Sequence, residues 1–153
     1  MRPIAHAAAS LVLAGGVYAA TRSPALTALN FVCGVFIDID HLPEFMIHHR
    51  FTQGPHRIFE SEMHVEAERT VLFFHGYDLA LLLSLGLVLT GFTGAALSVG
   101  SAMVVHLLMD QYYNPIKTPW AFFLIYRALK GFRTDAVYHR FSTKEWQEKR
   151  RAL

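Results

Sequence analysis

The chain has little charge and almost no cysteine. Asp, Glu, Lys and Arg account for 17% of its 153 residues, whereas 53% are hydrophobic; soluble proteins carry roughly 25% charged residues. Cys33 is the only cysteine, so neither a disulfide within the chain nor a cluster of thiolates around a metal can form. The composition predicts a membrane protein of one domain.

Basic stripes and nucleotide-binding motifs are also missing. The net charge is only +2, and no run of basic residues is interleaved with aromatics as in a strand-binding groove, so we expect no nucleic-acid partner. The glycine pairs match neither a phosphate-binding loop nor a dinucleotide fingerprint. A Ser-His-Asp triad is the main enzymatic competitor, but no serine has a Gly-x-Ser-x-Gly setting; the candidate serines are Ser10, Ser84, Ser98 and Ser101.

Four apolar segments can be followed along the chain, at residues 3–21, 25–37, 70–90 and 95–110. Pro24 suits a helix start, and Asn114 with Pro115 ends the fourth segment. Residues 91–94, Gly-Phe-Thr-Gly, allow a hairpin, because residues 79–109 are too long for one helix across a core of roughly 30 Å. We predict an all-α integral membrane bundle of about four transmembrane helices. The first segment also resembles a secretory signal, although His6 at its start is unusual for one.

The remaining chain is more polar. A loop at about 42–69 holds His48, His49, His56 and His64, to which no role is assigned. Residues 117–153 mix aromatic and basic side chains and then read as a polar helix, which predicts an interfacial and cytoplasmic tail. We therefore divide the chain into a transmembrane metal-site domain, 1–116, and this tail. Basic residues crowd the loop and the tail, so both termini are expected in the cytoplasm, in the cell membrane or an inner membrane.

The apolar segments carry a few histidines and aspartates. His106 and Asp110 are four residues apart and share a helical face, and His75 with Asp78 is predicted to do the same one turn apart. Asp38 and Asp40 end the second segment, where carboxylates oppose the helix dipole and need a cation. The alternatives are a core histidine with a capping aspartate, and solvent exposure of Asp40.

These polar residues fall at one depth. Measured from the outer helix ends at about 1.5 Å per residue, they lie between about 18 and 24 Å inward. Ionisable groups at that depth are costly unless they pair or bind an ion, so we predict a metal site. The predicted ligands are His6, Asp38, His75, His106 and Asp110, and the predicted catalytic bases are Asp40 and Asp78. The donor set suits zinc best, with manganese or iron as alternatives, in one or two ions.

The motifs resemble a known family. His6 in an apolar first helix, Asp38-x-Asp40-His41, a histidine before a small residue at 75–76, and His106-x-x-x-Asp110 resemble the YdjM-like membrane-bound, metal-dependent hydrolases. The resemblance spans residues 1–116. The family's usual Pro-Asp-x-Asp is Ile-Asp-x-Asp here, and its compact His-Arg-x-x-Thr-His-Ser motif is absent. The resemblance implies a metal site and, at the level of class, a hydrolase.

The expected function is a membrane-embedded, metal-dependent hydrolase at the cytoplasmic face. The position of the site at the edge of the hydrocarbon suggests a phosphoester or another lipid-borne substrate, with membrane lipid as the partner. The alternative is a non-enzymatic metal-binding protein or a metal or proton transporter, because histidine and aspartate also line ion pathways. Haem ligation by His75 and His106 is a further rival, against which the neighbouring carboxylates argue.

Overall fold

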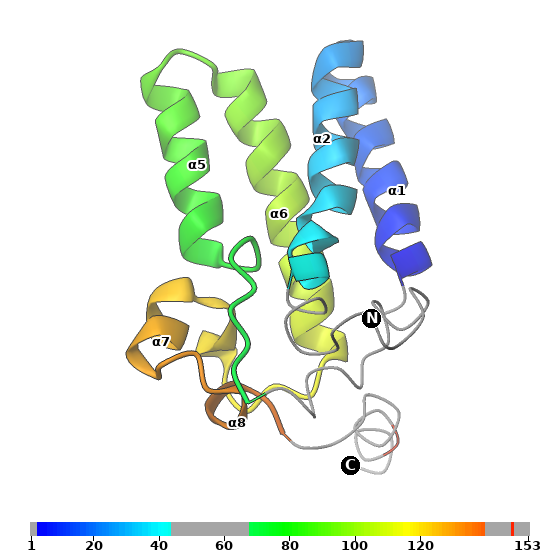
Figure 1. The fold of residues 1–153 in the computed structure, drawn as a ribbon. Helices are drawn as coiled ribbons and strands as arrows, with labels where there is room; N and C mark the ends of the chain where they lie inside the picture. The colour runs from blue at the N-terminus through cyan, green and yellow to red at the C-terminus, as the bar shows by residue number, and fades with distance from the viewer. Residues whose placement is uncertain (1–2, 44–67, 140–147, 149–153) are drawn as a thin grey trace.

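The computed structural model describes residues 3–43, 68–139 and 148, and these residues fold into helices without a β-sheet. Helix α1 (Pro3–Thr21) forms a hairpin with α2 (Pro24–Phe36), and α5 (Tyr77–Leu89) forms a second hairpin with α6 (Thr93–Tyr113). Both hairpins have their turns at the same end of the molecule (Figure 1). Because α2 packs on α6 and α1 also contacts α6, the two hairpins form one helical assembly with α6 at its centre. The all-helical prediction is confirmed for these residues.

Three helical segments are long and apolar enough to cross a membrane: Ile4–Thr21, Pro24–Pro43 and Thr93–Tyr113. Large apolar side chains on them point outward; Val12 is 77% and Leu97 70% exposed, as expected of surfaces that face lipid. Helix α5 is apolar too, but its 13 residues span only about 20 Å. The structure therefore supports a membrane protein, and the fourth span stays a prediction.

The helix boundaries follow local sequence signals. The Ser23 side chain accepts the N–H of Leu26, and Pro24 is the first residue of α2. Gly91, with φ of +84°, makes the turn between α5 and α6 in a conformation that favours glycine. At the other end of α2 the chain tightens into the 3₁₀ helix η1 (Ile37–Asp40), which carries both aspartates of the second segment.

The predicted helix over 70–90 is wrong in its first third. Gly76 is extended, with φ −134° and ψ 124°, and α5 begins at Tyr77. Asp78 lies in the first turn, where its carboxylate accepts the N–H of Leu79, and acidic groups favour a helix N-terminus. His75 precedes the helix, so it shares no helical face with Asp78. Residues 70–76, which precede α5 in the chain, have no regular secondary structure.

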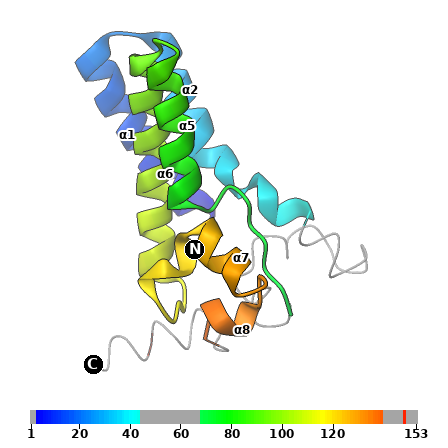
Figure 2. The same ribbon diagram turned by 90° about the vertical axis from the view of Figure 1, so that its left-hand side faces the viewer.

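The C-terminal part lies across the open ends of the hairpins (Figure 2). It consists of the 3₁₀ helix η3 (Pro119–Phe122), α7 (Leu124–Leu129) and α8 (Thr134–Val137). Isolated β-bridges join Arg69 to Arg133 and Ile116 to Tyr138. Buried side chains from α6, η3 and the α8 region meet in one apolar core: Val99, Met103, Leu107, Ala121, Phe122, Val137 and Tyr138.

Exposed aromatic and aliphatic residues remain on this part of the fold. Trp120, Ile125 and Leu129 are exposed, which agrees with a position at the membrane interface. Most of the predicted polar helix at 142–151, of which only Glu148 is described, lies outside the described residues, and so does most of the histidine-rich loop with its four histidines.

Gly34 marks a close contact between α2 and α1. A Cβ at this position would lie 2.5 Å from Ser10 Oγ and 3.1 Å from Ser10 Cβ. We expect Gly34→Ala to force the helices apart and to destabilise the fold by about 1–3 kcal/mol, the usual cost of overpacking. The thermal midpoint in mild detergent measures this. Gly86→Ala is the matched control, because nothing lies within 4 Å of a Cβ there; an equal loss in both variants would contradict the close contact.

Candidate metal centre

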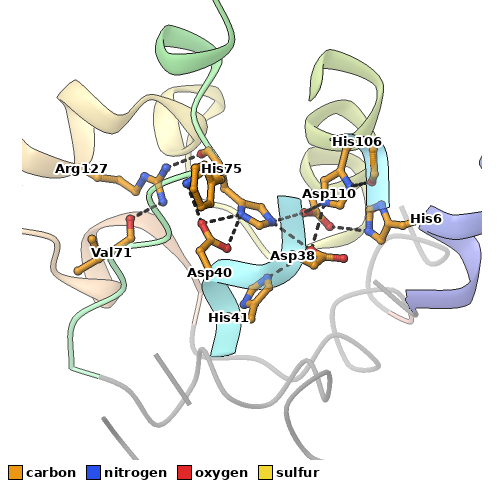
Figure 3. A network of polar contacts seen from close by, with 11 residues as sticks. His6, Asp38, Asp40, His41, Val71, His75, His106, Asp110 and Arg127 are labelled. Carbon is orange, nitrogen blue, oxygen red and sulfur yellow. Dashed lines mark hydrogen bonds and ion pairs between the residues drawn. The ribbon is translucent and has the colours of Figure 1, made fainter. Parts of the chain in front are cut away.

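Polar side chains from separate segments converge at the open ends of the helices (Figure 3). α1 contributes His6, η1 contributes Asp38 and Asp40, the irregular chain before α5 contributes His75, and α6 contributes His106 and Asp110. The structure thus brings all five predicted ligands together, although the first and last of them, His6 and Asp110, are 104 positions apart in the sequence.

Four of these residues form the compact part of the cluster. One donor atom from each of Asp38, His75, His106 and Asp110 lies within 4.8 Å of the other three. His75 Nε2 is 3.3 Å from both Asp38 Oδ1 and Asp110 Oδ2. His106 Nε2 is 3.2 Å from the same Asp38 oxygen and 3.4 Å from the same Asp110 oxygen. Two nitrogens and two oxygens therefore surround one point.

The backbone fixes which nitrogen of His106 faces the cluster. Its Nδ1 is 2.8 Å from the carbonyl oxygen of Gly34, which can only accept, so Nδ1 carries the proton. A neutral ring then presents the lone pair of Nε2 to the carboxylates of Asp38 and Asp110. Nε2 is buried and makes no hydrogen bond with the described residues. A lone pair facing two carboxylates requires either a second proton on the ring or a metal cation between them.

Asp40 fixes His75 in the same way. Asp40 Oδ1 and Oδ2 lie 3.0 and 3.2 Å from His75 Nδ1, and Oδ2 also accepts the N–H of Phe74 at 2.7 Å. The Nδ1 proton of His75 therefore points to Asp40, and Nε2 points to Asp38 and Asp110. A carboxylate behind a histidine, orienting its other nitrogen toward an ion, is a recurrent arrangement in metal sites.

His6 lies beside the four residues. Its Nε2 is 3.1 Å from Asp110 Oδ1, whereas Oδ2 of that carboxylate faces His75 and His106. The ring of His6 also stacks on that of His106, with 3.9 Å between ring centroids. Two stacked imidazolium cations would repel each other, so this geometry favours at least one neutral ring, the form that binds metals.

Burial makes the cluster costly without compensation. The side chains of His75 and His106 are 1% exposed and that of Asp110 4%, whereas Asp38 reaches 15%. Unpaired carboxylates in such surroundings cost several kcal/mol each, so they require protons on the imidazoles or a metal ion. The cluster is most open beside Asp38.

Two predicted catalytic residues have other partners in the structure. Asp40 holds His75, as described above. Asp78 accepts backbone N–H groups from Leu124 at 3.0 Å and Ile125 at 2.8 Å, at the start of α7. Its carboxylate belongs to neither group of residues that could hold a metal in the described chain. The prediction placed Asp78 by helical periodicity, and the late start of α5 removes that basis.

Two residues at the site are absent from the predicted set. His41 lies 3.6 Å from Asp38 Oδ1 through its Nε2 and forms, with Asp40 and His75, a second group of potential ligands. Its place in Asp-x-Asp-His was the available signal. Arg127 donates to the backbone of His75, and a lone arginine among the aromatic and aliphatic residues of α7 was the corresponding signal.

Comparisons of the chain with protein families, with curated proteins and with solved structures found no match. The geometry of the site is therefore the basis for a functional proposal.

Asp78 should matter for stability and not for metal binding. Its carboxylate accepts three backbone N–H groups, two of them from α7. We expect Asp78→Ala to cost about 1.5–3 kcal/mol, the usual contribution of hydrogen bonds to a charged acceptor, and to lower the thermal midpoint. The metal content at saturation, measured by elemental analysis, should equal that of the wild type. Loss of metal in a folded Asp78→Ala protein would return Asp78 to the site.

Proposed function

We propose that the chain binds a divalent metal ion at the open ends of its helices and is a membrane-embedded, metal-dependent hydrolase. The observation that carries the proposal is the orientation of the two imidazoles. The Nδ1 atom of His106 contacts the carbonyl oxygen of Gly34, and that of His75 contacts Asp40. Both Nε2 atoms therefore face the same two oxygens, one from Asp38 and one from Asp110. In this proposal those four residues are the ligands.

Zinc is the metal we propose. Two imidazole nitrogens and two carboxylate oxygens match a four-coordinate zinc site, and zinc can accept a fifth ligand during catalysis. Manganese and iron use the same donors and are the alternatives. His6 donates to the Asp110 oxygen that faces away from His75 and His106, so we assign it to holding Asp110 in place.

A divalent ion bound there would act as a Lewis acid on a carbonyl or phosphoryl oxygen and would make water more acidic. Asp40 would keep His75 oriented, because its Oδ2 contacts His75 Nδ1 and accepts the N–H of Phe74, and its Oδ1 lies 3.0 Å from the same nitrogen. His41 lies beside Asp38 on the more exposed side of the cluster, at 14% side-chain exposure. Among the described residues it is the side chain best placed to move a proton to or from a substrate.

The location suggests the substrate class. The cluster is built from residues at the open ends of the apolar helices, and Trp120 and Ile125, which follow α6 in the chain, are exposed. We therefore place this end of the helices at the level of the lipid headgroups, where exposed aromatic residues are common. We propose four spans with both termini and the 42–69 loop in the cytoplasm. The substrate we propose is a phosphoester carried by a lipid, which could reach the cluster from the side of Asp38.

Metal binding is tested with substitutions of the four ligands. His106→Ala, His75→Ala and Asp110→Asn should each remove nearly all bound zinc from protein purified in mild detergent, as measured by elemental analysis. Asp40→Asn should weaken zinc binding about 10- to 100-fold, the usual effect of changing a residue behind a ligand. Chelation should lower the thermal midpoint of the wild type, because an ion that binds only the folded state stabilises it. It should leave that of Asp110→Asn nearly unchanged.

Asp135→Asn is the matched control for Asp110→Asn. Asp135 is a partly exposed aspartate on α8, paired with Arg133 at 2.7 Å and outside both groups of potential metal ligands in the described residues. It should keep both the metal and the response to chelator. A wild type that holds no metal, and whose thermal midpoint ignores chelator and added zinc or manganese alike, would overturn the metal site and the hydrolase proposal with it.

Hydrolysis is tested separately from metal binding. Phosphate release from a lipid phosphoester in mixed micelles should depend on zinc and should be lost in His106→Ala and retained in Asp135→Asn. The same protein in sealed vesicles reports on transport. Zinc or proton flux across the vesicle wall without any hydrolysis would favour the transporter over the enzyme.

Topology is tested with reporter fusions. Arg22 and Phe92 lie in the two hairpin turns, which are at one end of the helices in the structure. Reporters there should read external, and reporters at Gln53 and Leu153 should read internal, because basic residues favour the cytoplasm. A cytoplasmic signal at Arg22 or Phe92 would reverse the face at which we place the site.

A further inference from the structure

Arg127 is a buried arginine on a short helix whose neighbours face outward. It is 1% exposed, whereas Ile125 and Leu129 on the same helix are 65% and 80% exposed. Arginine is almost never fully buried unless its donors have partners. Its burial therefore indicates a specific task within the fold.

The partners of Arg127 are carbonyl groups of the irregular chain that carries His75. One terminal nitrogen donates to Val71 O at 2.9 Å, and the other donates to the carbonyl oxygen of His75 itself. Carbonyls outside a helix or sheet need such partners when buried, and more so at membrane depth. The planar guanidinium can bridge two carbonyls at once, which a lysine ammonium does with less geometric control. Figure 3 shows Arg127 reaching His75 from the side opposite Asp38.

Further contacts join the same two stretches of chain on either side of Arg127. The N–H of Thr70 donates to Phe132 O at 2.8 Å, and the hydroxyls of Thr70 and Thr134 are 2.8 Å apart. At the other end, Asp78 accepts from the first residues of α7. Residues 124–134 are thus fastened to residues 68–78 at both ends, with Arg127 in the middle.

We propose that Arg127 is a positioning residue for His75, and that the segment 124–134 is thereby part of the metal site. His75 is the one ligand of the four that no helix holds. Its imidazole is oriented by Asp40 and its backbone by Arg127, so the two together replace the rigidity that α6 gives to His106 and Asp110. The proposal rests on the proposed metal site, whose ligand it concerns.

The test compares Arg127→Gln and Arg127→Lys with two controls. Arg133→Gln removes an exposed arginine from the same segment, and Thr134→Val removes a buried hydrogen bond of the same junction without touching His75. Two quantities are measured in purified protein: the zinc dissociation constant, by competition with a chelator, and the visible spectrum of the cobalt-substituted protein. Hydrogen exchange of residues 71–76 is measured in parallel, with and without zinc.

Arg127→Gln should weaken zinc binding about 10- to 100-fold, change the cobalt spectrum and speed exchange at 71–76. Arg127→Lys, which keeps the charge and one donor, should recover part of the affinity. Thr134→Val should lower the thermal midpoint yet keep the dissociation constant and the spectrum, which separates positioning from general stability. Arg133→Gln should resemble the wild type in all measurements.

Wild-type affinity, spectrum and exchange in Arg127→Gln would overturn the proposal while leaving the metal site intact. If Arg127→Gln does not fold, Arg127→Lys decides the matter by the same three measurements. If the wild type binds neither zinc nor cobalt, the metal site fails. In that case faster exchange at 71–76 in Arg127→Gln alone would still support Arg127 as the holder of this segment, and unchanged exchange would overturn that as well.

Discussion

The fold depends on the meeting of two carboxylates, Asp38 and Asp110, with the Nε2 atoms of His75 and His106 at the end of apolar helices. Each of these groups would be stabilised by water, and the structure gives the imidazoles and Asp110 almost none. Their mutual distances of 3.2–3.4 Å mean that the groups compensate one another, either through protons on the imidazoles or through a bound ion. Removing one partner leaves a buried charge, which is more costly than the pair is favourable. The two hairpins must therefore stay in register with one another.

The reasoning from sequence matches the structure best for the site residues that lie on or directly after regular helices, whereas His75 was predicted as a ligand from a helix that begins only at Tyr77. His106 and Asp110 are four residues apart in α6, and the fixed rise of a helix gives their common face and their depth. The same reasoning placed Asp38 at the end of α2 and His6 near the start of α1, at the level where the structure has them. Helix geometry alone does not say which helix faces pack together. That part of the prediction rested only on the energetic cost of leaving these polar groups unpaired.

Prediction failed at the start of the third apolar segment. Asp78 accepts N–H groups at the start of α5 and from α7, and Gly76 adopts an extended conformation, so the helix begins after His75. The hydrophobic periodicity of the sequence cannot predict this helix start, because it does not show which backbone N–H groups the Asp78 carboxylate will bind. Arg127 was missed for a related reason. Its partners are backbone carbonyls of residues 71 and 75, and backbone acceptors leave no mark in a sequence.

The packing of the helices and the chemistry of the site share residues, and Gly34 shows this most directly. The absence of a Cβ lets α2 approach Ser10 of α1, and the carbonyl of the same residue accepts the proton of His106 Nδ1. A change in the spacing of α1 and α2 would shift that carbonyl and with it the direction of the His106 lone pair. His75 is held differently: Asp40, at the end of η1, contacts its imidazole, and Arg127 donates to its backbone carbonyl. The cluster thus joins ligands fixed by helix packing to one ligand fixed by hydrogen bonds alone. The position of His75 can therefore be altered through Arg127 without disturbing the contact between α1 and α2.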